Sequence, residues 1–181
     1  MIKTINNKEK LRYLEDYKRI VALKYLKKDE LEEFIKVTDI MSYKDKDIII
    51  KEGEFSPFIF GVLKGSVVVT VSDNDVDNNE DVYICTIGRG DVFGEAGIFM
   101  NVKRTANVVS TDETDIFCIH RTDFLKFIKI HPGIGIKILM LIIFSLLRKL
   151  KEANLELAFE RKADIDQNDI DGLVDKIMRQ V

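Results

Sequence analysis

The sequence predicts an α+β chain that is mainly β, with a jelly-roll barrel (a double-stranded β-helix) between N-terminal helices and one long C-terminal helix. Three observations predict this fold. Apolar residues recur with helical spacing in the first third of the chain, short strand-like segments separated by turn residues follow, and helical spacing returns after residue 120. Many short strands with regular turns are typical of a small barrel or jelly roll.

The first part of the chain is predicted to be helical. Five apolar residues within residues 8–27 recur at spacings of three and four, which indicates one amphipathic helix: Leu11, Leu14, Tyr17, Val21 and Tyr25. Residues 29–34 then form a short second helix with acidic residues in its first turn. We therefore assign residues 1–28 to an N-terminal helical extension.

The middle of the chain carries seven segments with the composition of strands. They are residues 39–43, 47–51, 58–64, 66–72, 82–87, 107–111 and 115–120. Turn chemistry separates them, as at Lys64-Gly65-Ser66, and the polar run 73–80 is interpreted as a hairpin tip. We assign the barrel domain to residues 29–131.

A long helix is predicted to start at Pro132, a residue suited to the first helical position, and to run to about Arg161. Apolar residues recur there at alternating steps of four and three: Leu139, Ile143, Leu146, Leu150, Ala153 and Leu157. This heptad-type seam is typical of two helices that pack along their length, the alternative being a helix buried only within its own domain. The dimerisation or lid helix is assigned to 132–163, and an acidic helical tail, with an amphipathic segment at 167–179, to 164–181.

Composition bounds the class of protein. The chain has 181 residues, 33% of them charged, and a net charge of −3, so it lacks the basic surplus that DNA or anionic membranes select. The acidic tail is too short to read a major groove, and the apolar stretch 134–147 is too short to span a membrane. Cys85 and Cys118 lie in apolar strand-like runs and are expected to be buried, reduced thiols of a cytoplasmic protein.

The candidate site lies in residues 90–108. Gly94 permits unusual backbone angles and close approach of a ligand, and residues 95–98 can begin a helical turn whose N–H groups face an anion. Arg104 could return to the same pocket, where an arginine suits a phosphate and the Glu95 carboxylate suits a ribose hydroxyl. An anion that carries a sugar is a nucleotide. The alternative is that Glu95 and Arg104 form an ordinary salt bridge.

These residues resemble the phosphate-binding cassette of the cyclic-nucleotide-binding domain family. The family pattern is Phe-Gly-Glu-x-(Ala/Gly)-hydrophobic, then Arg-(Ser/Thr/Ala)-Ala-x-Val. Here it reads Phe93-Gly94-Glu95-Ala96-Gly97-Ile98 and Arg104-Thr105-Ala106-Asn107-Val108. The resemblance covers roughly residues 29–161. Two departures are Ala96, where a larger apolar residue is common, and Lys103, which replaces a frequent proline.

The resemblance implies a role for each matching residue. Glu95 would accept the ribose 2′-hydroxyl, and Arg104 would pair with the cyclic phosphate, helped by the N–H groups of Gly97 and Thr105. The resemblance also implies a parallel homodimer through residues 132–161, in which Asn154 is a candidate for contacting the base across the dimer. The expected ligand-binding residues are Phe93, Gly94, Glu95, Ala96, Gly97, Arg104, Thr105 and Asn154. Thr105 leaves cAMP and cGMP both open as ligand, and no metal or cofactor is expected.

The function expected from this resemblance is that of a sensor, not an enzyme, which passes ligand binding through its C-terminal helix to a protein effector that the sequence does not name. One alternative is a degenerate domain that binds no nucleotide and serves as an oligomerisation or interaction module. The other is a cupin-type enzyme, whose metal needs several histidines. The chain has only His120 and His131, so this reading is disfavoured.

Overall fold

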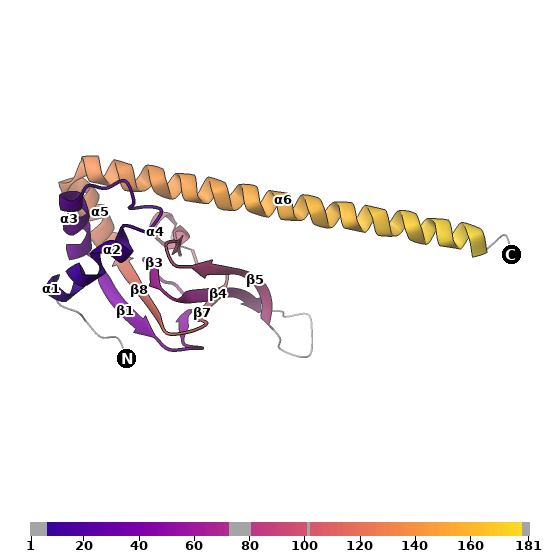
Figure 1. Ribbon diagram of the computed structural model, residues 1–181, viewed down its shortest axis with the longest axis horizontal. Coiled ribbons are helices and arrows are strands. Elements are labelled where there is room, and N and C mark those ends of the chain that lie inside the picture. The colour runs from indigo at the N-terminus through magenta and orange to yellow at the C-terminus, as the bar shows by residue number, and fades with distance from the viewer. Residues whose placement is uncertain (1–6, 73–80, 101, 179–181) are drawn as a thin grey trace. The chain divides into compact units, whose positions relative to one another are not determined.

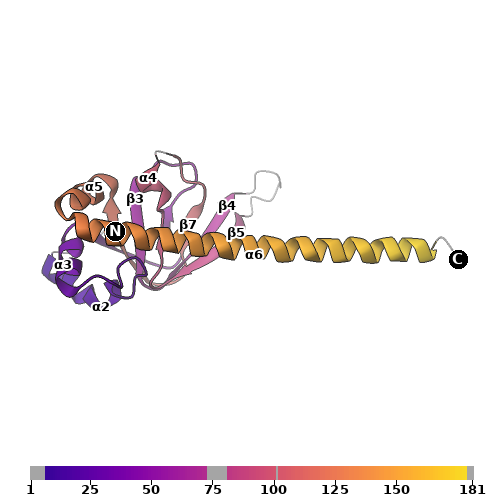
Figure 2. The same cartoon turned by 90° about the horizontal axis from the view of Figure 1, so that it is seen from above.

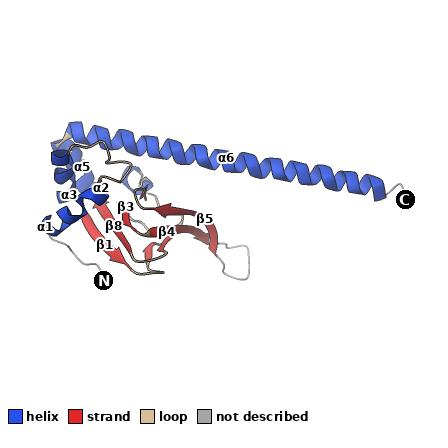
Figure 3. Cartoon of the chain, in the orientation of Figure 1, coloured by secondary structure: helices blue, strands red, loops and turns tan. Residues whose placement is uncertain are grey.

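The computed structural model describes residues 7–72, 81–100 and 102–178 (Figure 1). The chain forms two compact units, residues 1–142 and residues 143–181. The strands of the described residues all belong to the first unit, as the red arrows of Figure 3 show.

Two four-stranded antiparallel sheets form the first unit, with strand orders β1-β8-β3-β6 and β2-β7-β4-β5. The strands are β1 (Asp39–Tyr43), β2 (Ile48–Ile50), β3 (Phe58–Lys64), β4 (Ser66–Ser72), β5 (Asp81–Gly88), β6 (Val92–Phe93), β7 (Asn107–Ser110) and β8 (Thr114–His120). Apolar side chains from both sheets share one core cluster, which includes Val62, Val67 and Val108. The predicted jelly-roll fold is confirmed.

The seven predicted strands are all present, within a few residues of the predicted bounds. Strand β6 was not predicted, because it is only two residues long and is held by pairing with Phe60 and Gly61 of β3. The predicted hairpin tip at 73–80 lies outside the described residues. Cys118 is buried as expected, but Cys85 is exposed, because β5 is an edge strand whose residues 81–86 all face solvent.

The single helix predicted over residues 8–27 was wrong. The segment breaks into α1 (Asn7–Lys10), the 3₁₀ turn η1 (Leu11–Tyr13) and α2 (Leu14–Tyr17), followed by turns. After Tyr17, the N–H groups of Ile20, Leu23 and Leu26 bond carbonyls only three residues back. The N–H of Val21 instead bonds the carbonyl of Gly90, 2.8 Å away in the barrel. Contacts with the barrel therefore override the local helical pattern.

Most of the short helices gather at one end of the sheets, away from the β4–β5 hairpin, as Figures 1 and 2 both show. They include α3 (Lys28–Lys36) and α5 (Arg121–Ile130), whose N-terminus is capped by His120, because Nδ1 accepts from the N–H of Thr122 at 3.2 Å. Their apolar faces pack with β8 and the start of the last helix in a second core cluster. The Tyr17 and Phe117 rings stack there with centroids 5.1 Å apart.

The last helix, α6, runs from Pro132 to Met178. Its first turns belong to the first unit, where Ile138 and Ile142 are buried in the second core cluster. The expected separation into a helix ending near 161 and a distinct segment at 167–179 was wrong. Residues 161–167 contain neither glycine nor proline, so nothing in the backbone chemistry interrupts the helix. Among the described residues, the structure offers no helix both long and apolar enough to cross a membrane.

Candidate functional site

The candidate site begins where β6 ends. The Phe93 ring is 3% exposed and stacks on Phe60 with centroids 5.1 Å apart, so Phe93 anchors the strand in the core. The next residue, Gly94, has φ +76°, and a Cβ there would lie 3.1 Å from Nη1 of Arg104 and 3.2 Å from the carbonyl oxygen of Phe58. Glycine therefore lets the chain turn sharply while the guanidinium passes close to the backbone.

Arg104 is the central side chain of the site, and its residue is only 8% exposed. Nη1 donates to the carbonyl of Gly94 at 2.9 Å, and Nη2 donates to the carbonyl of Phe58 at 2.6 Å and to Oγ of Ser56 at 3.2 Å. Within the described part of the chain, Nε is buried and has no hydrogen-bond partner. A buried N–H of a charged group that lacks a partner is costly, because no hydrogen bond compensates for its loss of solvent.

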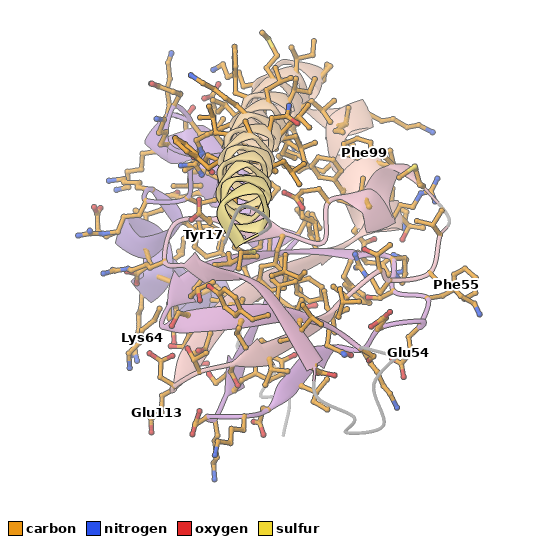
Figure 4. The ribbon with its side chains drawn as sticks, turned by 90° about the vertical axis from the view of Figure 1, so that its right-hand side faces the viewer. Tyr17, Glu54, Phe55, Lys64, Phe99 and Glu113 are labelled. Atoms are coloured by element: carbon orange, nitrogen blue, oxygen red, sulfur yellow. The ribbon has the colours of Figure 1, made fainter. Side chains whose placement is uncertain are left out.

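The backbone of Arg104 is fixed by the loop between β2 and β3. Its N–H donates to the carbonyl of Glu54, and its carbonyl accepts from the N–H of Gly53, both at 2.8 Å. Figure 4 shows Glu54, Phe55 and Phe99 on one side of the molecule, with Lys64 and Glu113 on another. These two backbone bonds hold the cassette against the β2–β3 loop, although the two segments are about fifty residues apart in the sequence.

Glu95 is also 8% exposed and lies close enough to influence Arg104 electrostatically. Burial lowers the pKa of the Arg104 guanidinium below its usual value, and the carboxylate of Glu95 acts in the opposite direction. Glu95 thus helps to keep a buried positive charge in place. The site can offer an anion one charged donor group and a hydroxyl-binding carboxylate beside it.

The short helix α4 (Ala96–Phe99) follows Glu95 and brings its backbone against Arg104. A Cβ at Gly97 would lie 2.5 Å from the carbonyl oxygen of Ser56 and 2.9 Å from Nη2 of Arg104. The Gly97 N–H, expected to face the phosphate, donates to the carbonyl of Gly94 at 3.0 Å in this structure. The backbone contacts predicted for the phosphate therefore remain predictions.

The predicted site residues fall into three groups. The structure brings Gly94, Glu95, Gly97 and Arg104 together in the first unit. Ala96 and Thr105 are exposed beside them, and the Phe93 ring belongs to the core. Asn154 is an exposed residue of α6 in the second unit, and its contact with a base stays a prediction.

Ser56 and the carbonyl of Phe58, which both bond Arg104, were not predicted from the sequence. No local pattern pointed to Ser56, because its partner lies 48 residues further along the chain.

The described part of the first unit also contains hollows away from the cassette. One of about 490 Å³ lies between α3, β1 and α5, and one of about 630 Å³ lies beside Tyr13 and Tyr43. Neither contains a cassette residue. In the first hollow, four charged lining residues form two ion pairs among themselves, Glu33 with Lys36 and Asp123 with Lys126.

Comparisons with known proteins agree with this geometry. The family model described as "Cyclic nucleotide-binding domain" matches residues 40–131. Human cGMP-dependent protein kinase 2 is 33% identical over 100 residues, which cover 55% of this chain and 13% of the kinase. The cAMP-activated global transcriptional regulator CRP of Pasteurella multocida is 31% identical over 105 residues, 58% of this chain and 49% of that protein. The chain therefore spans less than half the length of these two relatives.

Solved structures share the fold at lower identity. A cyclic nucleotide-binding domain from Methylobacillus flagellatus superposes with a TM-score of 0.70 at 20% identity, covering 84% of each chain. The catabolite activator protein of Thermus thermophilus superposes with a TM-score of 0.65 at 22% identity, covering 77% of this chain and 62% of that one. With the family model matching residues 40–131 and the cassette folded around Arg104, the chain belongs to the cyclic nucleotide-binding domain family.

Proposed function

We propose that this chain is a non-catalytic sensor of a 3′,5′-cyclic mononucleotide. The observation that carries the proposal is the buried guanidinium of Arg104, whose Nε–H has no partner within the described residues. A cyclic phosphate is a monoanion whose oxygen can accept a hydrogen bond from this N–H and whose charge can neutralise the buried guanidinium. Glu95, buried beside it, is the group that would accept the ribose 2′-hydroxyl.

The two sequence relatives described above are named for cGMP and for cAMP, so both ligands remain candidates. Ligand binding would stabilise the cassette around Arg104 and shift the position of α6. A cytoplasmic protein effector would sense this shift. Such a change requires that the ligand bind one conformation more tightly than another. No metal, cofactor or DNA takes part in this proposal.

The proposal is tested by calorimetric titration of the purified protein with cAMP, cGMP and 5′-AMP. We expect saturable binding of at least one cyclic nucleotide and much weaker binding of 5′-AMP, which lacks the ring that presents a single negative charge. If neither cyclic nucleotide binds at millimolar concentration, the sensor function is refuted. The degenerate domain, which serves only in oligomerisation or interaction, then takes its place.

We also propose that α6 pairs with a second copy of the chain. Five apolar residues on one stripe of the helix are each more than half exposed, at spacings of three, four, three and seven: Met140 (53%), Ile143 (53%), Leu147 (56%), Leu150 (57%) and Leu157 (51%). Leu139, which the sequence placed in the seam, packs instead against the core of the first unit. The stripe therefore runs through Met140 and Leu147, with Asn154 at the position between Leu150 and Leu157.

In a parallel pair with matched register, Asn154 would face its own copy, and a single such asparagine favours a two-stranded, in-register dimer. The test is the mass of the protein in solution by sedimentation equilibrium. Leu150→Lys places a charge in the seam and should give a monomer. Glu152→Lys, which adds a positive charge on another face of the same helix, should leave the dimer intact. A monomeric wild-type protein, or two variants with the same mass, would contradict the pairing.

A further inference from the structure

Ser56 is a half-buried residue of the β2–β3 loop, and the sequence gives no reason to connect it with the cassette. Its Oγ accepts a hydrogen bond from Nη2 of Arg104 at 3.2 Å. We propose that Ser56 is a positioning residue for the cyclic phosphate, because it orients the edge of the guanidinium that receives the anion. The inference rests on the proposed nucleotide-binding function and adds a residue to that site.

The protons of the guanidinium show why this contact matters. An arginine side chain has five N–H protons, one on Nε and two on each Nη. The bonds to Ser56 and to the carbonyl of Phe58 account for both protons of Nη2, and the bond to Gly94 accounts for one of Nη1. The second proton of Nη1 and the Nε–H are left over, and of the two nitrogens it is Nε that is buried and without any partner in the described residues.

Nε and Nη2 together form one of the edges with which an arginine binds an oxyanion through two parallel bonds. An anion that accepts one hydrogen bond from Nε must therefore accept the second, parallel bond from Nη2. The bond of Nη2 to Phe58 is short, at 2.6 Å, whereas its bond to the Ser56 hydroxyl is longer, at 3.2 Å. The Ser56 bond is thus the one that shares its Nη2 proton with an anion while the hydroxyl still holds this edge of the guanidinium in place.

The loop keeps Ser56 where it can act. Two backbone bonds of 2.8 Å join Gly53 and Glu54 to Arg104. The carbonyl of Ser56 also lies so close to Gly97 that a Cβ there would come within 2.5 Å. Ser56 therefore lies between Arg104 and α4, with its hydroxyl on Arg104 and its carbonyl against Gly97.

The experiment compares cyclic-nucleotide affinities by calorimetry for three variants. Ser56→Ala should lower the affinity about tenfold, the effect of one hydrogen bond to a charged group. Ser56→Thr keeps the hydroxyl and should restore the affinity. Ser42→Ala, which removes a serine bond to Asp115 in β8, should leave it unchanged. Thermal unfolding of each variant shows that the fold is intact.

Two measurements separate positioning from a general effect on the loop. In an Arg104→Lys background, which lacks the two-pronged edge, Ser56→Ala should cause no further loss of affinity. In the ligand-free wild-type protein, NMR of the Arg104 guanidinium should show rotation about Cζ–Nη2 that becomes faster in Ser56→Ala. Failure of the wild-type protein to bind any cyclic nucleotide would refute the proposed function, whereas the NMR result still tests the contact. Equal affinity of wild type and Ser56→Ala, or the same loss in both backgrounds, would overturn the role of Ser56.

Discussion

Gly97 is the residue whose replacement perturbs the candidate site most directly. In Gly97→Ala, the new methyl group would lie 2.5 Å from the carbonyl oxygen of Ser56, 2.9 Å from Nη2 of Arg104 and 3.1 Å from its Cζ. The first contact is with backbone and cannot be relieved by rotating a side chain, so the loop or α4 must move. Overpacking of this kind costs about 1–3 kcal/mol, and the better helix propensity of alanine returns up to about 1 kcal/mol. We expect a net loss of about 1–2 kcal/mol.

The assay is thermal unfolding together with nucleotide titration. For a chain of this size the loss corresponds to a lower Tm by about 2–8 °C. The cyclic-nucleotide affinity should also fall, because the methyl group displaces the guanidinium. Gly133→Ala is the matched control: a Cβ there meets no atom within 4 Å, and the variant should be as stable as the wild type or slightly more so. Equal Tm and affinity for Gly97→Ala and Gly133→Ala would refute the packing of Arg104 on α4.

Two further predictions concern side chains outside the cassette. A thiol reagent at pH 8 should modify the exposed Cys85 in the native protein but spare Cys118 until the protein unfolds, because burial raises the pKa of Cys118 to about 12. Mass spectrometry of the labelled protein measures the two rates, and equal rates would contradict the prediction. A hydrogen bond from Lys137 lowers the pKa of the Glu30 carboxyl below its ordinary 4.5, so the bond stabilises the fold at neutral pH and this contribution is lost as the pH falls through that range. Lys137→Ala should therefore reduce the free energy of unfolding at pH 7 by less than about 1 kcal/mol and not at pH 3, and a difference that persists at pH 3 would contradict the assignment.

The strands could be predicted because each carries its own alternation of residues and its own turn signals. Residues 58–64 and 66–72, for example, are separated by Gly65, whose φ of +78° fits a tight turn. Strand β6 could not be found in this way, because Val92 and Phe93 become a strand only by pairing with β3.

The N-terminal segment shows the opposite case, in which a clear local pattern misled. Tyr17 continues the helical spacing of Leu11 and Leu14, and it is indeed buried. The chain then turns to reach the carbonyl of Gly90, which lies 69 residues from Val21 in the sequence. Spacing within a segment carries no information about a contact of that kind.

The candidate site likewise contains residues that local sequence predicts and residues that only the fold brings in. Gly94, Glu95 and Arg104 could be identified because the cassette is nearly contiguous in the sequence. Ser56 and Phe58 could not, because they come from a loop and a strand 48 and 46 residues before Arg104. Only the folded barrel shows that the guanidinium is held by backbone carbonyls and one hydroxyl, with Nε left over.

The most direct test of the proposed function is a comparison of two arginine variants by calorimetric titration with cAMP and cGMP. Arg89 is a partly exposed arginine that pairs with Asp16, so Arg89→Ala removes the same charge from the chain without touching the cassette. The proposed function predicts that Arg89→Ala binds the preferred cyclic nucleotide as the wild type does. Arg104→Ala should lose about 2–5 kcal/mol of binding free energy. Equal binding by the two variants would contradict the claim that Arg104 holds the cyclic phosphate.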